Sequence, residues 1–264
     1  MAVRGGVVNR RPQIMGIINA TPDSFYNESR NGNISRAMEM LANGAEWIDV
    51  GGESTRPGAT IISIEKELNR VIPLVEEISK HGKVSIDTRH VEVARAALNA
   101  GAVMINDVSG LRDSAMFELV LETGCSVCIM HMLGEPGNMQ DNPQYENVVT
   151  EVTQYLLNKA NELVQRGHPK ELIYLDPGIG FGKHLEHNIA LLQSSNQLRP
   201  YSILWGVSRK SIIGEICNQK DTSERLSGTL AIASFAYKNS IDIIRVHDIR
   251  EHMDLFEVLN ALEE

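Results

Sequence analysis

The stretch LIYLDPGIGFGK, residues 172–183, shows the pattern on which the rest of the chain is built. An apolar run ends on the carboxylate of Asp176, and the proline that follows cannot extend a hydrogen-bonded strand. Glycines at 178, 180 and 182 then permit tight turns or a close approach to another group. A buried strand that carries an acid to a glycine-rich loop indicates a ligand site.

The same unit, a short apolar run followed by a predicted helix, occurs eight times without a break in composition. The predicted strands cover residues 14–18, 47–50, 83–86, 102–105, 126–130, 172–175, 203–207 and 241–244. Short strands that are apolar throughout are typical of parallel strands buried on both faces. A doubly wound sheet is the alternative, but eight regular units in 264 residues favour a single TIM-type eight-stranded β/α barrel.

Domain and helix boundaries follow from the same pattern. We predict one domain over residues 1–264, with a short N-terminal leader at 1–12. The first helix is expected at 34–43, after a polar loop at 26–33, and a long helix is expected at 145–165. The residue Asp113 is read as the N-cap of another helix.

Composition limits the possible partners. The formal net charge of −9 argues against a nucleic-acid or anionic-membrane partner, and no apolar run approaches the length of a membrane span. Three cysteines, an odd number, favour a reducing compartment. We therefore expect a cytoplasmic protein that acts on small molecules.

In a barrel of this type, the active site lies at the C-terminal ends of the strands. The polar residues at the predicted ends are Asn19, Glu53, Ser54, Thr55, Arg56, Asp87, Asn106, Asp107, His131, Asp176, Arg209, Lys210, Arg245 and His247. Any single one of them can be a helix cap or an interstrand hydrogen-bonding group. A polar residue at nearly every strand end exceeds what a structural barrel needs, which indicates a binding site.

One part of this set suits a polar heteroaromatic ring. Asp87, Asn106 and Asp176 offer acceptors and an amide for an edge with N–H donors, such as an aminopyrimidinone. Lys210 can donate to a carbonyl or nitrogen of the same ring.

The other part suits phosphate. Arg56, Arg245 and His247 are expected to act as cationic donors to phosphate oxygens. Asn19 offers a neutral oxygen that Mg²⁺ accepts beside phosphate oxygens and water. The implied ligand is a heteroaromatic ring joined to a phosphate or diphosphate.

Two other motifs are weak. The loop Gly178–Lys183 resembles a phosphate-binding loop, but it is one residue short and His184 replaces the required Ser or Thr. Cys125 and Cys128 are more simply read as core residues than as a zinc or redox pair.

Seven segments, in order, resemble those of the dihydropteroate synthase family. They are MGIINATPDSF (15–25), DVGGESTRPGA (49–59), SIDT (85–88), INDVSG (105–110), DPGIGFGK (176–183), WGVSRKS (205–211) and RVHD (245–248). They lie at seven of the eight predicted strand ends. The resemblance implies a transferase of folate biosynthesis that joins p-aminobenzoate to 6-hydroxymethyl-7,8-dihydropterin diphosphate, giving 7,8-dihydropteroate and diphosphate.

The resemblance also implies roles for individual residues. The pterin would contact Asp87, Asn106, Met130, Asp176, Phe181 and Lys210. The diphosphate would contact Arg56, Arg245 and His247, with Mg²⁺ as cofactor on Asn19. The p-aminobenzoate pocket, where sulfonamides compete, would contain Phe25, Thr55, Pro57, Lys210 and Ser211. The catalytic roles would fall to Asp87, Lys210, Arg245 and His247, and the enzyme would be a homodimer.

Two alternatives remain at this point. A pterin-binding methyltransferase-type barrel would share the ring-binding residues, but it would have little use for Arg56 or for a metal ligand at Asn19. A non-catalytic pterin-binding paralogue predicts the loss of Asn19, Lys210 or Arg245, and all three are present.

Overall fold

The computed structural model describes residues 11–20, 26–54, 62–135 and 137–263. Eight parallel strands pair in chain order, and the last pairs with the first, so that the sheet closes into a barrel. The strands are β1 (Gln13–Asn19), β2 (Trp47–Gly51), β3 (Lys83–Asp87), β4 (Met104–Asp107), β5 (Ser126–Met130), β6 (Ile173–Asp176), β7 (Ser202–Gly206) and β8 (Ile243–Val246). The predicted TIM-type barrel is confirmed.

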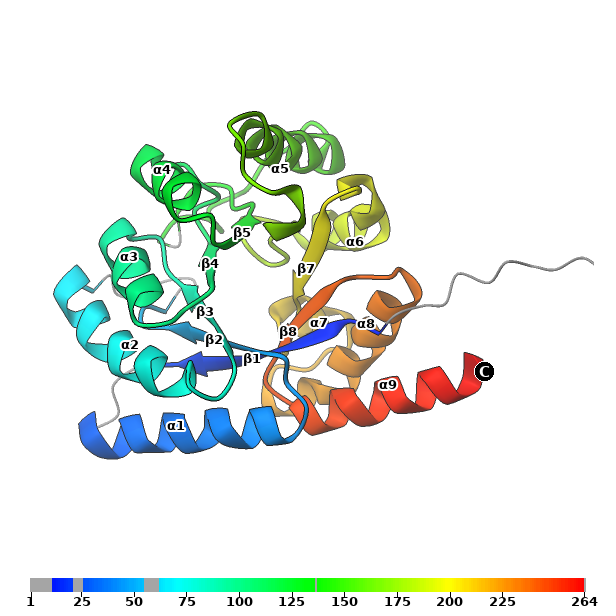
Figure 1. Cartoon of the computed structure of the whole chain (residues 1–264). Helices are drawn as coiled ribbons and strands as arrows, with labels where there is room; N and C mark the ends of the chain where they lie inside the picture. The colour runs from blue at the N-terminus through cyan, green and yellow to red at the C-terminus, as the bar shows by residue number, and fades with distance from the viewer. Residues whose placement is uncertain (1–10, 21–25, 55–61, 136, 264) are drawn as a thin grey trace, which may run out of the picture.

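Helices surround this barrel on the outside (Figure 1). They are α1 (Tyr26–Ala42), α2 (Ile64–Ile78), α3 (Val91–Asn99), α4 (Ser114–Thr123), α5 (Val148–Gln165), α6 (Leu185–Ser194), α7 (Ser211–Ile216), α8 (Leu226–Lys238) and α9 (Ile249–Glu263). No helix in the described part of the chain combines the length and apolar character that a transmembrane span requires.

The buried residues form two main cores. The larger lies between the outer face of the barrel and the helices, and it includes the outward-facing residues Ile48 and Ile105. The smaller fills the barrel interior with Met15, Trp47, Met104, Cys128, Leu204 and Ile243. All six lie nearer the N-terminal ends of their strands than the predicted site residues do. The apolar interior therefore forms a floor, above which the C-terminal mouth is polar.

Helix α1 begins at Tyr26, so the predicted loop at 26–33 is wrong. This stretch is polar and contains Gly32, which gives it little helical tendency by itself. The second half of α1 buries Ala37 and Met40 against the barrel. Because adding a turn to an existing helix costs far less than starting one, the packed half can extend into the polar half.

Two other boundaries differ slightly from the expectation. Helix α5 begins at Val148 because the side chain of Asn147 accepts a hydrogen bond from the backbone N–H of Thr150 at 3.0 Å and caps the helix there. The short helix α7 was not expected. The predicted cap at Asp113 is confirmed, since its carboxylate accepts from the N–H of Ala115 at 2.8 Å.

Candidate functional site

Alternation along the strands directs the polar side chains into the barrel mouth. Residues two apart on a strand face the same side of a sheet. Met104 belongs to the interior core, so Asn106, two residues later, also faces inward. Trp47 belongs to the same core, so Asp49, two residues later, faces inward as well. The parallel register then sets Asp87 beside Asn106 on the neighbouring strand. Residues that are far apart in sequence therefore meet in one place.

Arg245 on β8 joins two carboxylates at the centre of this mouth. Its Nε donates to Oδ2 of Asp49 at 2.5 Å, and its NH2 group donates to Oδ2 of Asp87 at 2.7 Å. The amide of Asn106 donates to the same Asp49 oxygen at 3.2 Å. Asp49 is fully buried, whereas the side chain of Arg245 is 19% exposed. The guanidinium therefore bridges the floor of the site and its open side.

The charges in this cluster alter one another. Burial raises the pKa of Asp87 to about 7, against the lowering effect of Arg245 and with a further rise from Asp49. Burial alone would lower the pKa of Arg245, but the carboxylates of Asp49 and Asp87 raise it. Arg245 therefore stays charged, while Asp87 changes its protonation near neutral pH.

Sequence reasoning missed Asp49, because only residues at or beyond the strand ends were considered. Asp49 lies two residues before the end of β2, in an otherwise apolar strand. An ionised group there needs a partner, because an unpaired buried charge is very costly. The acid in the run WIDV was the signal that could have found it.

A second cluster lies on β6 and in the loops after β6 and β7. Nζ of Lys210 donates to the carbonyl of Ile179 at 2.6 Å and lies 3.9 Å from the ring centroid of Phe181. Phe181 packs against a small apolar cluster that includes Met130, and Asp176 pairs in register with Met130. Burial lowers the pKa of Lys210 to about 8, although the carboxylate of Asp176 favours its charged form. The structure therefore brings an aromatic ring, a buried acid and an ammonium group of the expected pterin residues close together.

Lys183 braces the glycine-rich loop from inside. Its buried Nζ donates to the carbonyls of Phe181 at 2.9 Å, Gly178 at 3.0 Å and His131 at 3.1 Å, and it lies 3.2 Å from Nδ1 of His131. A Cβ on Gly178 would lie 1.9 Å from the carbonyl oxygen of His131, so only glycine fits. Burial lowers the pKa of Lys183 to about 7 and that of His131 to about 3. The ammonium group of Lys183 donates its hydrogen bonds to carbonyl groups of the protein. The loop is therefore not a phosphate-binding loop, in agreement with the short spacing in the sequence.

Replacing Lys183 by Met should lower the free energy of unfolding by about 1–3 kcal/mol, because buried carbonyl groups lose their donor. It should also weaken pterin binding, since the loop carries Phe181 and follows Asp176. Urea unfolding measures the first effect, and calorimetric titration with the pterin measures the second. Lys220→Met, at an exposed position, is the control and should change neither quantity. Unchanged stability in Lys183→Met would show that the brace contributes nothing.

His247 differs from the expectation of a cationic phosphate donor. Burial, together with the neighbouring Arg245, lowers its pKa to about 4. The imidazole is therefore neutral at pH 7, unlike the cation expected from the sequence, and its contact with the diphosphate stays a prediction. It still has one N–H group with which to donate. Its Nδ1 lies 2.9 Å from Oγ of Ser208.

Several other strand-end residues hold loops in place. Glu53 accepts from Arg89 at 2.8 Å and from the N–H of Ile62 at 3.2 Å. Asp107 accepts from the backbone N–H groups of residues 109 and 111 at 2.8 and 2.7 Å. Arg209 has a positive φ of 55° and donates twice to Asp248, at 2.9 and 2.7 Å. These contacts give the three residues scaffold roles.

The remaining expected site residues lie at the rim or outside the described chain. Asn19 is exposed at the end of β1, beside Gly51 in register, and its carboxamide makes no hydrogen bond to a described residue. Ser211 is exposed and begins α7. Phe25, Thr55, Arg56 and Pro57 lie outside the described residues. Most of the expected p-aminobenzoate pocket is thus outside the described structure.

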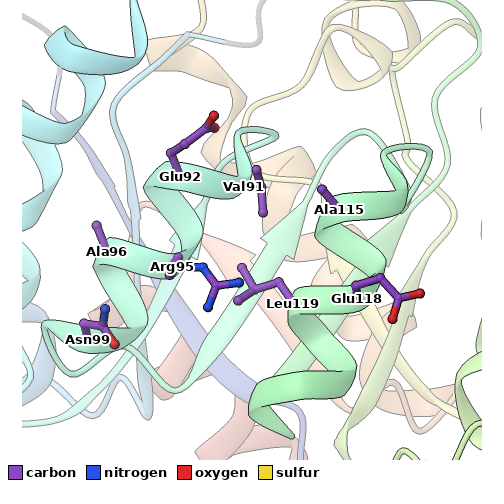
Figure 2. Close-up of a pocket in the computed structure, with 8 residues that line it drawn as sticks. All are labelled: Val91, Glu92, Arg95, Ala96, Asn99, Ala115, Glu118 and Leu119. Carbon is purple, nitrogen blue, oxygen red and sulfur yellow. The ribbon is translucent and has the colours of Figure 1, made fainter.

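A shallow apolar groove lies away from the mouth, on the outer surface between α3 and α4. Figure 2 shows Val91 and Arg95 of α3 facing Leu119 of α4 across it. Arg95 is paired with Glu122 at 2.8 Å. The groove contains none of the expected site residues.

The cysteines form no disulfide in this structure. Cys125, Cys128 and Cys217 are free thiols, and Cys128 lies in the interior core. No cluster of three or more His, Cys, Asp or Glu residues suited to a metal ion occurs among the described residues.

Comparison with known proteins places this site in a family. The family described as pterin binding enzyme matches residues 15–247. Dihydropteroate synthase of Escherichia coli (strain K12) is 44% identical over 258 residues, which cover 95% of this chain and 91% of that protein. The Burkholderia cenocepacia dihydropteroate synthase structure, complexed with 7,8-dihydropteroate, has a TM-score of 0.88 at 42% identity and covers 96% of this chain and 92% of that one. The Xanthomonas albilineans dihydropteroate synthase structure with 4-aminobenzoic acid has a TM-score of 0.89 at 37% identity, with 96% and 93% coverage. The chain therefore belongs to the pterin-binding enzymes and, within them, to the dihydropteroate synthases.

Proposed function

We propose that the mouth of this barrel joins p-aminobenzoate to 6-hydroxymethyl-7,8-dihydropterin diphosphate, releasing diphosphate and forming 7,8-dihydropteroate. The observation that carries the proposal is the meeting of two chemistries at one mouth, the Asp176–Lys210 side and the Arg245–Asp87 side. The first suits a hydrogen-bonding ring, and the second suits an anion that leaves from it. Related enzymes solved with 7,8-dihydropteroate and with 4-aminobenzoic acid support the same assignment.

The pterin would lie against Met130 and Phe181, which supply an apolar wall. Asp176 keeps Oδ1 in a hydrogen bond with the N–H of Gly178 at 2.7 Å, so its other oxygen can accept from ring N–H groups. Asn106 and Asp87 would complete the edge. Lys210 would donate to a ring carbonyl or nitrogen.

The charges that develop during the reaction indicate how these residues would accelerate it. Breaking the C–O bond to diphosphate puts negative charge on the leaving group, which Arg245 and the N–H of His247 would stabilise. The pterin methylene becomes positive, and the carboxylate of Asp87 would stabilise it through its field. The arylamine is a neutral nucleophile and needs positioning more than a base. After attack, the amine proton can leave to solvent, so no catalytic triad is needed.

The side chain of Asn19 could provide one neutral oxygen ligand to Mg²⁺ at the exposed rim of the barrel mouth. Mg²⁺ keeps several waters and takes few protein ligands beside substrate phosphates, which agrees with the chemistry of this donor. The ion, when bound, would supply positive charge to the diphosphate. Arg56 would add a guanidinium from the second loop.

Turnover tests the proposal directly. Protein incubated with both substrates and Mg²⁺ should release diphosphate and dihydropteroate in equal amounts, and a chelator should stop the reaction. Pterin binding without any turnover would favour a non-catalytic paralogue. Methyl transfer that needs no p-aminobenzoate would favour the methyltransferase reading.

Asn19→Ala should raise the Mg²⁺ concentration needed for half-maximal turnover by roughly tenfold to a hundredfold, since one ligand is lost. Affinity for the free hydroxymethyl pterin should not change, because that ligand has no diphosphate to hold the ion. A Mg²⁺ titration of activity measures the first quantity, and calorimetry measures the second. An unaltered Mg²⁺ requirement would remove Asn19 from the metal site.

The pH dependence of kcat/KM should be bell-shaped. Asp87, with a pKa raised to about 7, takes up a proton below that pH and loses its charge, so activity falls on the acid side. Lys210, with a pKa lowered to about 8, loses its proton above that pH, so activity falls on the alkaline side. Lys210→Arg should move the alkaline limb upward, because a guanidinium does not titrate in this range. An alkaline limb that stays in place would assign it to another group.

We also propose that the enzyme is a cytoplasmic homodimer. On α8, Phe235 is 39% exposed beside small residues, and Ile216 at the end of α7 is 57% exposed. Two exposed large apolar side chains on neighbouring helices suit a subunit interface. The free thiols support a reducing compartment. Light scattering of wild type and Phe235→Glu tests the interface, and the variant should be monomeric.

A further inference from the structure

Ser208 makes two contacts with His247, although 39 residues separate them in the sequence. It follows β7, and it is only 8% exposed. Its Oγ accepts a hydrogen bond from the backbone N–H of His247 at 3.2 Å and lies 2.9 Å from Nδ1 of the same residue. One hydroxyl group therefore holds both the backbone and the ring of His247.

The position of the protons follows from counting donors. A serine hydroxyl has one proton to donate. If Nδ1 carried a proton and donated it to Oγ, the hydroxyl proton would need another acceptor, and no described residue supplies one. If the hydroxyl donates to Nδ1, both contacts between the two residues are satisfied, because Oγ still accepts from the backbone N–H, and the donor left over is Nε2–H of the half-buried His247. Ser208 is more deeply buried than His247, and a buried donor is rarely left unpaired, so the second arrangement is favoured.

The charges around the His247 ring keep it neutral, so its single proton can lie on either Nδ1 or Nε2. Arg245, Arg36 and Arg209 all oppose a positive imidazole, and burial acts in the same direction. Asp248 favours the cation, but both of its oxygens are bonded to Arg209. In a neutral ring, one nitrogen donates and the other accepts.

We propose that Ser208 is a positioning residue that fixes the proton of His247 on Nε2, so that Nε2–H can donate to the leaving diphosphate. Nε2 lies on the side of the ring away from Ser208 and makes no hydrogen bond to a described residue. The opposite tautomer would present a lone pair to an anion and would repel it. This inference rests on the proposed diphosphate role of His247, but the tautomer itself can be tested without that role.

Nuclear magnetic resonance reads the tautomer directly. Protein with ¹⁵N-labelled imidazoles should show His247 protonated on Nε2 and bare on Nδ1 at neutral pH, with the signals assigned by their loss in His247→Gln. In Ser208→Ala, Nδ1 loses its donor, and the ring should become a mixture of both tautomers. Ser208→Thr keeps the hydroxyl and should restore the wild-type signals.

The kinetic effect should follow the tautomer. Ser208→Ala should lower kcat/KM for the pterin diphosphate by roughly threefold to tenfold, as expected for one weakened hydrogen bond. Affinity for the free hydroxymethyl pterin should stay the same. Ser195→Ala is the matched control, because it removes another buried hydroxyl, one that bonds to Leu191 and Trp205 outside the site. It should lower stability without changing the signals of His247.

Each outcome decides one point. A wild-type ring with its proton on Nδ1 would overturn the inference, and so would a Ser208→Ala protein with unchanged signals. If the signals behave as expected but His247→Gln uses the diphosphate substrate as well as wild type does, the diphosphate role of His247 fails while the tautomer assignment stands.

Discussion

Arg245→Ala should lose about 3–5 kcal/mol of folding free energy and most of its activity. The stability loss is expected because the fully buried carboxyl group of Asp49 loses its guanidinium partner, and Asp87 loses the same partner. The rate should fall by about 10²–10³ because a donor to the leaving group is gone. Binding of the free hydroxymethyl pterin should suffer much less than binding of its diphosphate.

A second substitution separates the two effects. Asn at position 49 is neutral, so Asp49→Asn in the Arg245→Ala background should recover part of the stability but none of the activity. Urea unfolding and steady-state kinetics of the single and double variants measure both. If the double variant regained activity, Arg245 would act only by neutralising Asp49, and its role at the diphosphate would be refuted.

The stability loss should also depend on pH. Arg245 lowers the pKa of Asp87, so removing it should raise that pKa above the value of about 7. A carboxyl group with a raised pKa binds more protons in the folded state than in the unfolded state, so its contribution to stability falls as pH rises. The deficit of Arg245→Ala relative to wild type should therefore be larger at about pH 8 than at about pH 5. A deficit that does not change with pH would mean that the unpaired carboxylates are not its cause.

Asp176→Asn should weaken pterin binding by more than roughly tenfold, because a buried acceptor becomes a donor facing ring N–H groups. The substitution can be made with little change to the loop. Oδ1 of Asp176 accepts from Gly178, and an Asn side chain can keep that bond with its own oxygen. Only the second oxygen, which lies 3.7 Å from a Cβ built on Gly206, changes to an amino group.

Calorimetric titration with the pterin measures this effect. Asp107→Asn provides the control, since Asp107 is also a buried acid at a strand end, but its oxygens are bonded to its own loop. The control should be less stable than wild type and should bind pterin normally once folded. Pterin affinity of Asp176→Asn within twofold of wild type would show that Asp176 does not contact the ring.

The sequence determined the barrel and the position of its mouth. Short strands that are apolar on both faces are typical of a parallel sheet covered by helices, and eight regular units favour the closed barrel that the structure has. Once the strands are parallel, their C-terminal ends meet at one edge, so the sequence alone assigns Asn106 and Asp176 to one site. The glycine at 178 could also be seen to allow a close backbone approach.

Only the tertiary structure decided which charged groups pair and which are neutral. Arg245 meets Asp49 across 196 positions in the chain, because β8 and β2 flank β1 in the closed barrel. The ammonium of Lys183 turned inward to carbonyl groups, and His247 lost its charge because it is buried beside arginines. The sequence shows which charged groups are present. Their pairing and their pKa values depend on the distances between them and on their burial, which are set only when the chain folds.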